Sequence, residues 1–198
     1  MGKGSSSRRP ARACGGLAGA REKGDLDGRV LILTGTCGSG KSTVAELLAS
    51  REGWERISED EIWHRRFGRD RGAFGSPEHR RKRRLVHGDV FASVRGALAR
   101  GRPAVIDATV HESPPESFRE YRAFFARNHI AWRLFVLHPR LEVSMARDSS
   151  RRGWNAGPER VASLHAKFTG ATFPPEAFLD TSLDTPEETM GRVIAGGA

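Results

Sequence analysis

Residues 35–42 constrain this chain more than any other part of its sequence. They read GTCGSGKS, which satisfies the pattern G-x-x-x-x-G-K-[ST]. A short apolar run at residues 30–33 precedes them, and apolar residues at helical spacing follow them, so the motif lies between a predicted buried strand and a predicted helix. Glycines let the backbone N–H groups of such a loop turn inward around phosphate groups. The sequence therefore predicts a phosphate-binding loop.

The polar residues that close this loop indicate its ligand. Lys41 is placed to reach the β- and γ-phosphates of a nucleoside triphosphate, and the Ser42 hydroxyl can ligate Mg²⁺. A glycine-rich turn that binds nothing is the alternative, but the fixed offset of the Lys-Ser pair argues against it. The residues expected to bind the nucleotide are Gly35, Thr36, Cys37, Gly38, Ser39, Gly40, Lys41, Ser42 and Thr43.

The composition limits the class of protein. The chain has 198 residues, of which 37% are hydrophobic, and this is enough for a single buried core. Charged residues make up 29%, and no apolar run approaches the roughly 18 residues that cross a bilayer, so we expect no membrane span. Two cysteines, Cys14 and Cys37, cannot form a disulfide framework. A reducing, cytoplasmic location is the expectation.

The two ends of the sequence differ in character. Residues 1–27 are rich in Gly, Ala, Ser and Arg without any periodicity, which predicts a disordered basic tail. Residues 28–198 are predicted to form one domain.

Strands and helices are expected to alternate along that domain. The predicted strands cover residues 30–33, 54–57, 103–107, 131–137 and 177–180, and helices are predicted between them. This order favours an α/β fold with a parallel sheet of about five strands, in which ligands bind beyond the carboxyl ends of the strands. The helix at residues 77–100 is expected to turn these side chains inward: Leu85, Val86, Val90, Phe91, Val94 and Leu98.

Two aspartates are candidates for acid–base chemistry. Asp60 and Asp107 are each predicted at the carboxyl end of a strand that flanks the loop, so either could face the terminal phosphate. Phosphoryl transfer to a hydroxyl needs a carboxylate that takes the proton of the acceptor. Asp60 also fits a plain acidic residue in the first turn of a helix, and Asp107 also fits a turn former or the water shell of Mg²⁺.

Two arginines on one predicted helix are candidates for binding the transferred phosphate. Arg147 and Arg151 are four residues apart and therefore share a helix face. Arginines that close over the phosphate would stabilise its developing charge. A solvated basic helix end, favoured by the helix dipole, explains the same pair.

The positive charge of the chain is concentrated in one segment. The formal net charge is +9, and residues 65–84 contribute +7 of it through nine basic and two acidic residues. Such a segment indicates an anionic partner or a solvated helix face.

Taken in order, the motifs resemble those of a known family. GTCGSGKST, SEDE, VIDATVHESPPESFREY, RDSSRRG and LDTSLDTPEET are similar to motifs of the small P-loop kinases of the AAA-type ATPase and predicted-kinase group. This group includes 5′-hydroxyl polynucleotide kinases and chloramphenicol phosphotransferases. The resemblance covers residues 29–195 and implies a P-loop NTPase three-layer sandwich with a helical lid, ATP as the phosphate donor, and Mg²⁺.

The resemblance also implies a role for individual residues. Asp60 would be the general base, Asp107 and Thr109 would lie beside the acceptor, and Arg147 with Arg151 would be the arginines of the lid. Residues 180–182 would border the adenine.

Three functions are compatible with this pattern. The favoured one is an ATP-dependent kinase for a small hydroxyl compound. The second is a polynucleotide 5′-hydroxyl kinase, in which the basic segment follows the phosphates of the strand and Trp63, together with Phe67, stacks on a base. In polynucleotide kinases a basic residue lies three positions beyond the base, where this sequence has Trp63, and this favours the small acceptor. The third is an ATP-binding module or switch. Oligomeric state is left open.

Overall fold

The structure is a computed structural model, and it describes residues 29–110 and 116–196. The predicted tail, residues 1–27, lies outside the described residues, so its disorder and the domain boundary at residue 28 stay predictions. The described residues form five strands, seven α-helices and one short 3-10 helix. The strands are β1 (Val30–Gly35), β2 (Glu55–Ser58), β3 (Ala104–Asp107), β4 (Trp132–Leu137) and β5 (Phe178–Leu179).

The helices follow the strands in the predicted alternation. They are α1 (Lys41–Glu52), α2 (Glu59–Phe67), α3 (Pro77–Ala99), α4 (Glu116–Arg127), α5 (Leu141–Ser149), α6 (Pro158–Thr169) and α7 (Pro186–Ala195), with the 3-10 helix η1 at Pro175–Ala177. The sheet order is β2-β3-β1-β4-β5, and every neighbouring pair is parallel. This confirms the predicted α/β fold with a five-stranded parallel sheet.

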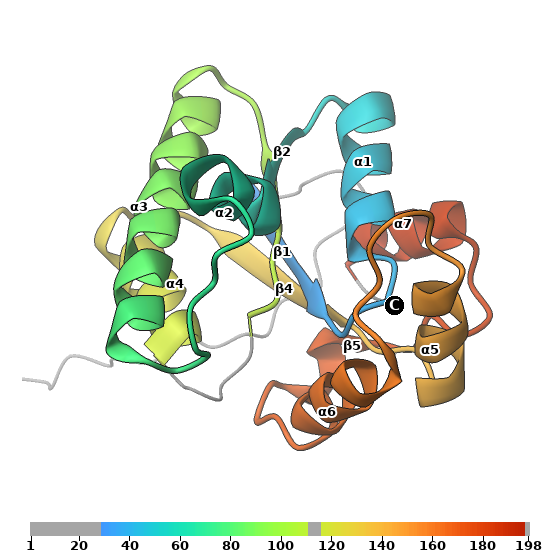
Figure 1. Cartoon of the computed structure of the whole chain (residues 1–198). Coiled ribbons are helices and arrows are strands. Elements are labelled where there is room, and N and C mark those ends of the chain that lie inside the picture. Colours follow the sequence, from blue (N-terminus) through green and yellow to red (C-terminus); the bar gives the residue numbers. More distant parts are fainter. Residues whose placement is uncertain (1–28, 111–115, 197–198) are drawn as a thin grey trace, which may run out of the picture.

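Strand β1 lies at the centre of the sheet and is buried along its whole length. Its side chains alternate between two hydrophobic clusters because successive residues of a strand face opposite sides. Val30 and Ile32 belong to the cluster that α3 and α4 complete, while Leu31 and Leu33 belong to the cluster that α1 and α7 complete. The sheet is therefore the middle of three layers, with helices on both faces (Figure 1).

Helices α5 and α6 correspond to the expected helical lid. They lie at the carboxyl end of β1, next to the loop that joins β1 to α1 (Figure 1). The Thr36 hydroxyl in this loop donates a hydrogen bond of 3.2 Å to the carbonyl oxygen of Val161 in α6. The lid helices thus pack directly against the phosphate-binding loop.

Helix α3 departs from the predicted pattern in its first half. Lys82 and Arg83 are buried, whereas Leu85 is 39% exposed. The expectation that Leu85 faces inward is wrong, because the packing of α3 against α2 and α4 places charged side chains at the inward positions of these turns. Further along α3, Val86, Val90 and Val94 are buried in the core, as predicted.

Candidate active site

The loop between β1 and α1 has the backbone that a phosphate site requires. Gly38 has a φ of 77°, and a Cβ there would lie 2.1 Å from the carbonyl oxygen of Ser144 in α5, so a larger residue is excluded. Gly40, the N-cap of α1, has a φ of 95°, and a Cβ there would meet nothing within 4 Å. The N-terminus of α1, with its free N–H groups, therefore opens onto a space that an anion can occupy.

The side chains of the loop are also suited to phosphate. Lys41 is buried, and its Nζ donates a hydrogen bond of 3.0 Å to the carbonyl oxygen of Thr36. The buried Ser39 hydroxyl has no hydrogen-bond partner among the described residues. An ammonium group has three donors, so Lys41 can bind a phosphate oxygen and keep the loop contact. These residues fit the triphosphate of a nucleotide.

The two predicted acidic residues lie at neighbouring strand ends. Asp107 is the last residue of β3, and it pairs in register with Leu33 of β1 on one side and Ser58 of β2 on the other. Ser58 is the N-cap of α2, and Asp60 lies in the first turn of that helix. The sheet therefore brings Asp60 and Asp107 to the edge at which the phosphate-binding loop begins.

Asp60 is held by an arginine that the sequence did not single out. Nη2 of Arg71 donates a hydrogen bond of 2.6 Å to Oδ1 of Asp60. Desolvation raises the pKa of Asp60, but the hydrogen bond from Arg71 and the positive charges of Arg71 and Lys41 outweigh it, so the pKa is lowered overall. Asp60 is therefore ionised at neutral pH, and the ammonium group of Lys41 is one of the positive charges that favour this form.

Asp107 lies in a different environment. It is 6% exposed, and its Oδ2 lies 3.6 Å from Nη2 of Arg56. Arg56 also forms ion pairs with Glu61 at 2.6 Å and with Glu46 at 3.6 Å. Asp107 is thus one carboxylate in a network centred on an arginine of β2.

The segment after β3 is fixed to the central strand. The Thr34 hydroxyl donates a hydrogen bond of 2.8 Å to the carbonyl oxygen of Val110 and accepts one of 2.9 Å from its N–H group. Thr109 therefore has a defined place beside the end of β1, and its side chain is exposed there. This position is compatible with the contact to an acceptor that the resemblance implies.

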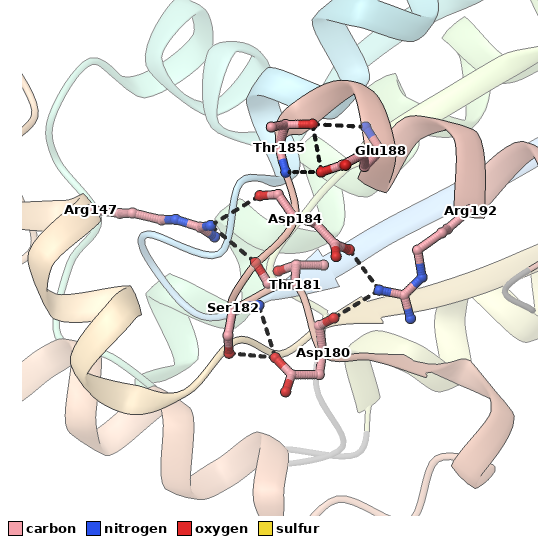
Figure 2. A network of polar contacts seen from close by, with 8 residues as sticks. All are labelled: Arg147, Asp180, Thr181, Ser182, Asp184, Thr185, Glu188 and Arg192. Atoms are coloured by element: carbon pink, nitrogen blue, oxygen red, sulfur yellow. Dashed lines mark hydrogen bonds and ion pairs between the residues drawn. The ribbon is translucent and has the colours of Figure 1, made fainter.

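Arg147 binds a loop instead of projecting freely. Its Nη2 donates hydrogen bonds to the carbonyl oxygens of Thr181, at 3.0 Å, and Asp184, at 3.4 Å (Figure 2). From the other side, Arg192 of α7 donates to the carbonyl oxygen of Asp180 and to Oδ2 of Asp184 (Figure 2). Arg147 therefore orders the segment predicted to border the adenine.

Arg151 does not share the environment of Arg147. Its Nη1 lies 3.8 Å from Oδ1 of Asp148, and its side chain is 40% exposed. Asp148 is buried, and its Oδ2 accepts hydrogen bonds from the backbone N–H groups of Ala156 and Gly157. The structure thus separates the two predicted arginines: Arg147 contacts the loop after β5, and Arg151 lies at the connection between α5 and α6.

Replacing Asp148 is expected to loosen this connection. Asp148→Ala leaves two backbone N–H groups without their acceptor, so we expect the free energy of unfolding to fall by about 2 to 3 kcal/mol. Urea denaturation measures the change. The control is Glu142→Ala on the same helix, which removes an exposed carboxylate and is expected to change stability by less than about 0.5 kcal/mol. Equal effects of the two variants would show that the Asp148 contacts contribute nothing specific.

Trp63 is not placed to contact a substrate. Its side chain is 2% exposed and belongs to the hydrophobic cluster on the α3 side of the sheet. The ring packs edge-to-face against Phe67 and lies beside His79 of α3, and the Arg71 guanidinium covers it at 5.2 Å from the ring centroid. The expectation that Trp63 stacks on a base is therefore not met, because α3 and Arg71 cover the ring.

Two arginines at this edge of the sheet were missed by sequence reasoning. Arg71 lies within the basic segment, where nothing in its spacing separates it from its neighbours, and Arg56 lies inside a strand. Their contacts join residues of different elements, and only the fold reveals them.

The sheet order, the loop geometry and the two strand-end carboxylates define a P-loop protein with the fold of the small kinases. A family model described as an AAA domain matches residues 30–171. The chain belongs to this family, as the resemblance of its motifs implied. No curated protein sequence matches it.

Several solved structures, two kinases among them, share the fold. A sugar kinase from Janibacter sp. HTCC2649 superposes with a TM-score of 0.61 at 22% identity, over 84% of this chain and 92% of that one. The tunicamycin resistance protein of Deinococcus radiodurans gives 0.62 at 18% identity, over 84% and 93%. Shikimate kinase from Acinetobacter baumannii gives 0.53 at 18% identity, over 83% and 90%.

The structure also bears on the membrane expectation. None of the helices in the described part of the chain is long and apolar enough to cross a bilayer.

Proposed function

We propose that this protein transfers the γ-phosphate of ATP to a hydroxyl group of a small molecule. The observation that carries the proposal is the position of Asp60, a carboxylate in the first turn of α2, directly after β2 and hydrogen-bonded to Arg71 at 2.6 Å. A nucleotide-binding module that only switches conformation has no acceptor hydroxyl, and so needs no carboxylate that takes the proton of one.

The chemistry assigns a part to each residue. The acceptor oxygen attacks the γ-phosphorus and forms the new P–O bond, the bond to the β,γ-bridging oxygen breaks, and ADP leaves. Asp60 takes the proton of the acceptor hydroxyl as general base. Lys41 and the N–H groups at the start of α1 stabilise the phosphate charge, while Asp107 and Thr109 orient the acceptor. Arg151, at the α5–α6 connection, would reach the transferred phosphate when this segment closes.

Mg²⁺ fits this arrangement through the nucleotide. Among the residues that the structure describes, no group of three His, Cys, Asp or Glu side chains could hold a metal ion. The Ser42 hydroxyl would therefore ligate the ion together with phosphate oxygens, and the bound ion would neutralise charge on the β- and γ-phosphates.

A small acceptor is favoured over a polynucleotide end. The burial of Trp63 removes the ring that would have stacked on a base, and the structural neighbours include a sugar kinase. Because the identity to that neighbour is 22%, the comparison supports a shared fold and not a shared substrate.

Transfer of labelled γ-phosphate tests the proposal. The acceptors are a panel of hydroxylated metabolites and antibiotics, and 5′-hydroxyl DNA and RNA oligonucleotides. Label on a small molecule is the expected result. Label only on an oligonucleotide, with binding that falls steeply as salt rises, would replace the proposal with a polynucleotide kinase. ATP binding without any transfer would replace it with a switch.

The pH dependence of transfer tests the place of Arg71 beside the base. A general base must be ionised, so the rate falls as the pH drops through its pKa. Because the bond from Arg71 lowers the pKa of Asp60, Arg71→Met is expected to raise that pKa and move the acidic limb of the kcat profile to higher pH. Arg71→Lys should restore part of the shift.

The matched control for this profile is Arg69→Met. Arg69 is exposed in the same loop, so its replacement removes the same charge and should leave the acidic limb in place. An unchanged profile in Arg71→Met would contradict the assignment of Asp60 as the titrating base.

A further inference from the structure

A buried histidine of α3 contacts both neighbouring helices, α2 and α4 (Figure 1). His87 lies near the middle of α3 and is 1% exposed. Its Nε2 lies 3.5 Å from Oε1 of Glu59, the first residue of α2, and its Nδ1 forms an ion pair with Oε2 of Glu120 in α4. The proposed reaction gives no part to any of these three side chains.

His87 carries a positive charge at neutral pH. Burial lowers its pKa, but its contacts with the carboxylates of Glu120 and Glu59 outweigh burial and raise the pKa to about 9. The titratable and charged groups where these helices meet are Glu59 of α2, Arg83 and Arg84 of α3, and Glu120 and Tyr121 of α4. Tyr121 is fully buried, and burial together with the charges of the two glutamates holds the pKa of its hydroxyl well above the usual range. Tyr121 is therefore neutral, and Glu59 faces the positive charge of His87.

Two contacts from different directions hold the first turn of α2. Glu59 pairs with His87 of α3, and the next residue, Asp60, accepts the hydrogen bond of 2.6 Å from Arg71. Successive residues of an α-helix are about 100° apart around its axis, so the two contacts hold the turn on two of its sides. A rotation of α2 about its axis would disturb both contacts together. The direction of the Asp60 carboxylate is therefore coupled to the pair of His87 and Glu59.

This pair is better shielded from water than the other ion pair of the same turn. The side chains of His87 and Glu59 are 2% and 17% exposed. The Glu61 side chain, which pairs with Arg56, is 65% exposed. Water and salt weaken an exposed ion pair more than a buried one, and breaking a buried pair leaves a charge without its partner. His87 therefore holds this turn more firmly than Arg56 does.

We propose that His87 is a positioning residue of the active site: through Glu59 it fixes the first turn of α2 and with it the direction of the Asp60 carboxylate. This inference rests on the proposed function, in which Asp60 is the general base. His87 itself does not touch the acceptor in this assignment. A displacement of a reacting group by about 1 Å can cost about 100-fold in rate, so we expect the pair to act on kcat and not on the binding of ATP.

Replacing Glu59 with glutamine tests the proposal through kinetics. Glutamine keeps the size of the side chain and removes the charge that attracts His87. At about pH 6, below the ordinary pKa of histidine, we expect kcat to fall about 10- to 100-fold while the KM for ATP changes little. The melting temperature, measured in parallel, shows whether the variant is folded.

Glu120→Gln is the matched control. It makes the same substitution at the other carboxylate that His87 contacts, but Glu120 lies on α4 and the pair with Glu59 stays in place. Its kcat at the same pH should stay within a few-fold of that of the unchanged protein. Equal losses of kcat in the two variants would overturn the proposal, because the cluster would then stabilise the fold without directing Asp60.

The proton on His87 provides a readout that depends on pH. A group whose pKa is raised in the folded protein contributes its stabilisation below its ordinary pKa and loses it as the pH rises through the raised value. The kcat of the unchanged protein is therefore expected to fall as the pH passes about 9. In Glu120→Gln this basic limb should move to lower pH, because one of the two carboxylates that raise the pKa of His87 is gone. A limb at the same pH in both proteins would contradict the proposal, and this variant decides even if Glu59→Gln does not fold.

An NMR titration separates this inference from the proposed function. The ¹³C shift of the Asp60 carboxyl gives its pKa without any transfer of phosphate. In Glu59→Gln, the loss of a neighbouring negative charge would by itself lower this pKa, whereas a rotated α2 would weaken the bond from Arg71 and raise it. A higher pKa of Asp60 in Glu59→Gln, but not in Glu120→Gln, supports the positioning by His87 even if no acceptor is phosphorylated. An unchanged or lower pKa overturns it and leaves phosphoryl transfer intact.

Discussion

Replacing Lys41 with alanine is expected to reduce phosphoryl transfer by about three orders of magnitude or more. Lys41 is the buried cation of the phosphate-binding loop, and its Nζ is held by the Thr36 carbonyl at 3.0 Å. Its ammonium group would stabilise the charge that develops on the transferred phosphate. In an environment from which water is largely excluded, such a charge has a large effect on the rate. Single-turnover transfer of labelled phosphate measures the loss.

A companion variant separates the charge from the packing of the side chain. Lys41→Met keeps an unbranched apolar stem and removes only the ammonium group. We expect the same loss of transfer with the melting temperature close to that of the unchanged protein. Transfer that survives in Lys41→Met would mean that the phosphate donor binds elsewhere.

Replacing Asp60 with asparagine is expected to lower kcat by about 10²- to 10⁴-fold, the range typical for loss of a general base. Asparagine keeps the size of the side chain and an oxygen that can accept the bond from Arg71, so the local structure should survive. Binding of ATP should be largely kept, because the proposed contact of Asp60 is with the acceptor and not with the nucleotide. Isothermal titration with ATP and Mg²⁺ alongside the transfer assay measures both quantities.

The neighbouring Glu61 provides the control for this variant. It lies in the same turn of α2, is exposed and pairs with Arg56, so Glu61→Gln should leave kcat within a few-fold of its starting value. A loss of ATP affinity in Asp60→Asn as large as its loss of transfer would contradict the assignment of Asp60 as base and favour a part in nucleotide binding.

Features encoded by neighbouring residues were predictable from the sequence. The phosphate-binding loop and the central strand follow from a contiguous motif and an apolar run, and Asp60 and Asp107 could be placed at strand ends by their distance from those runs. The order of the strands depends on which of them pair, and pairing is a property of the whole chain. The sequence predicted about five strands, and the structure arranges them as β2-β3-β1-β4-β5.

Contacts between distant residues account for what was not predicted. The spacing of Arg147 and Arg151 predicts a shared helix face and a shared role, yet Arg147 binds carbonyl groups 34 and 37 residues away. The sequence position of Trp63 on α2 is compatible with either solvent or core. The packing of α3 against α2 buries its side chain in the core. The basic segment, residues 65–84, predicts a solvated surface, whereas the packing of α3 against α2 and α4 buries Lys82 and Arg83.

Helix α5 touches both ends of the candidate nucleotide site. Its Ser144 carbonyl lies against Gly38 of the phosphate-binding loop, and Arg147, one turn further along, holds the segment that follows β5. If residues 180–182 border the adenine, as the motif resemblance implies, a single rigid helix sets the distance between the phosphate end and the base end of the site. A shift of α5 along its axis would move both contacts together, so the length of this helix would limit the size of the nucleotide that can bind.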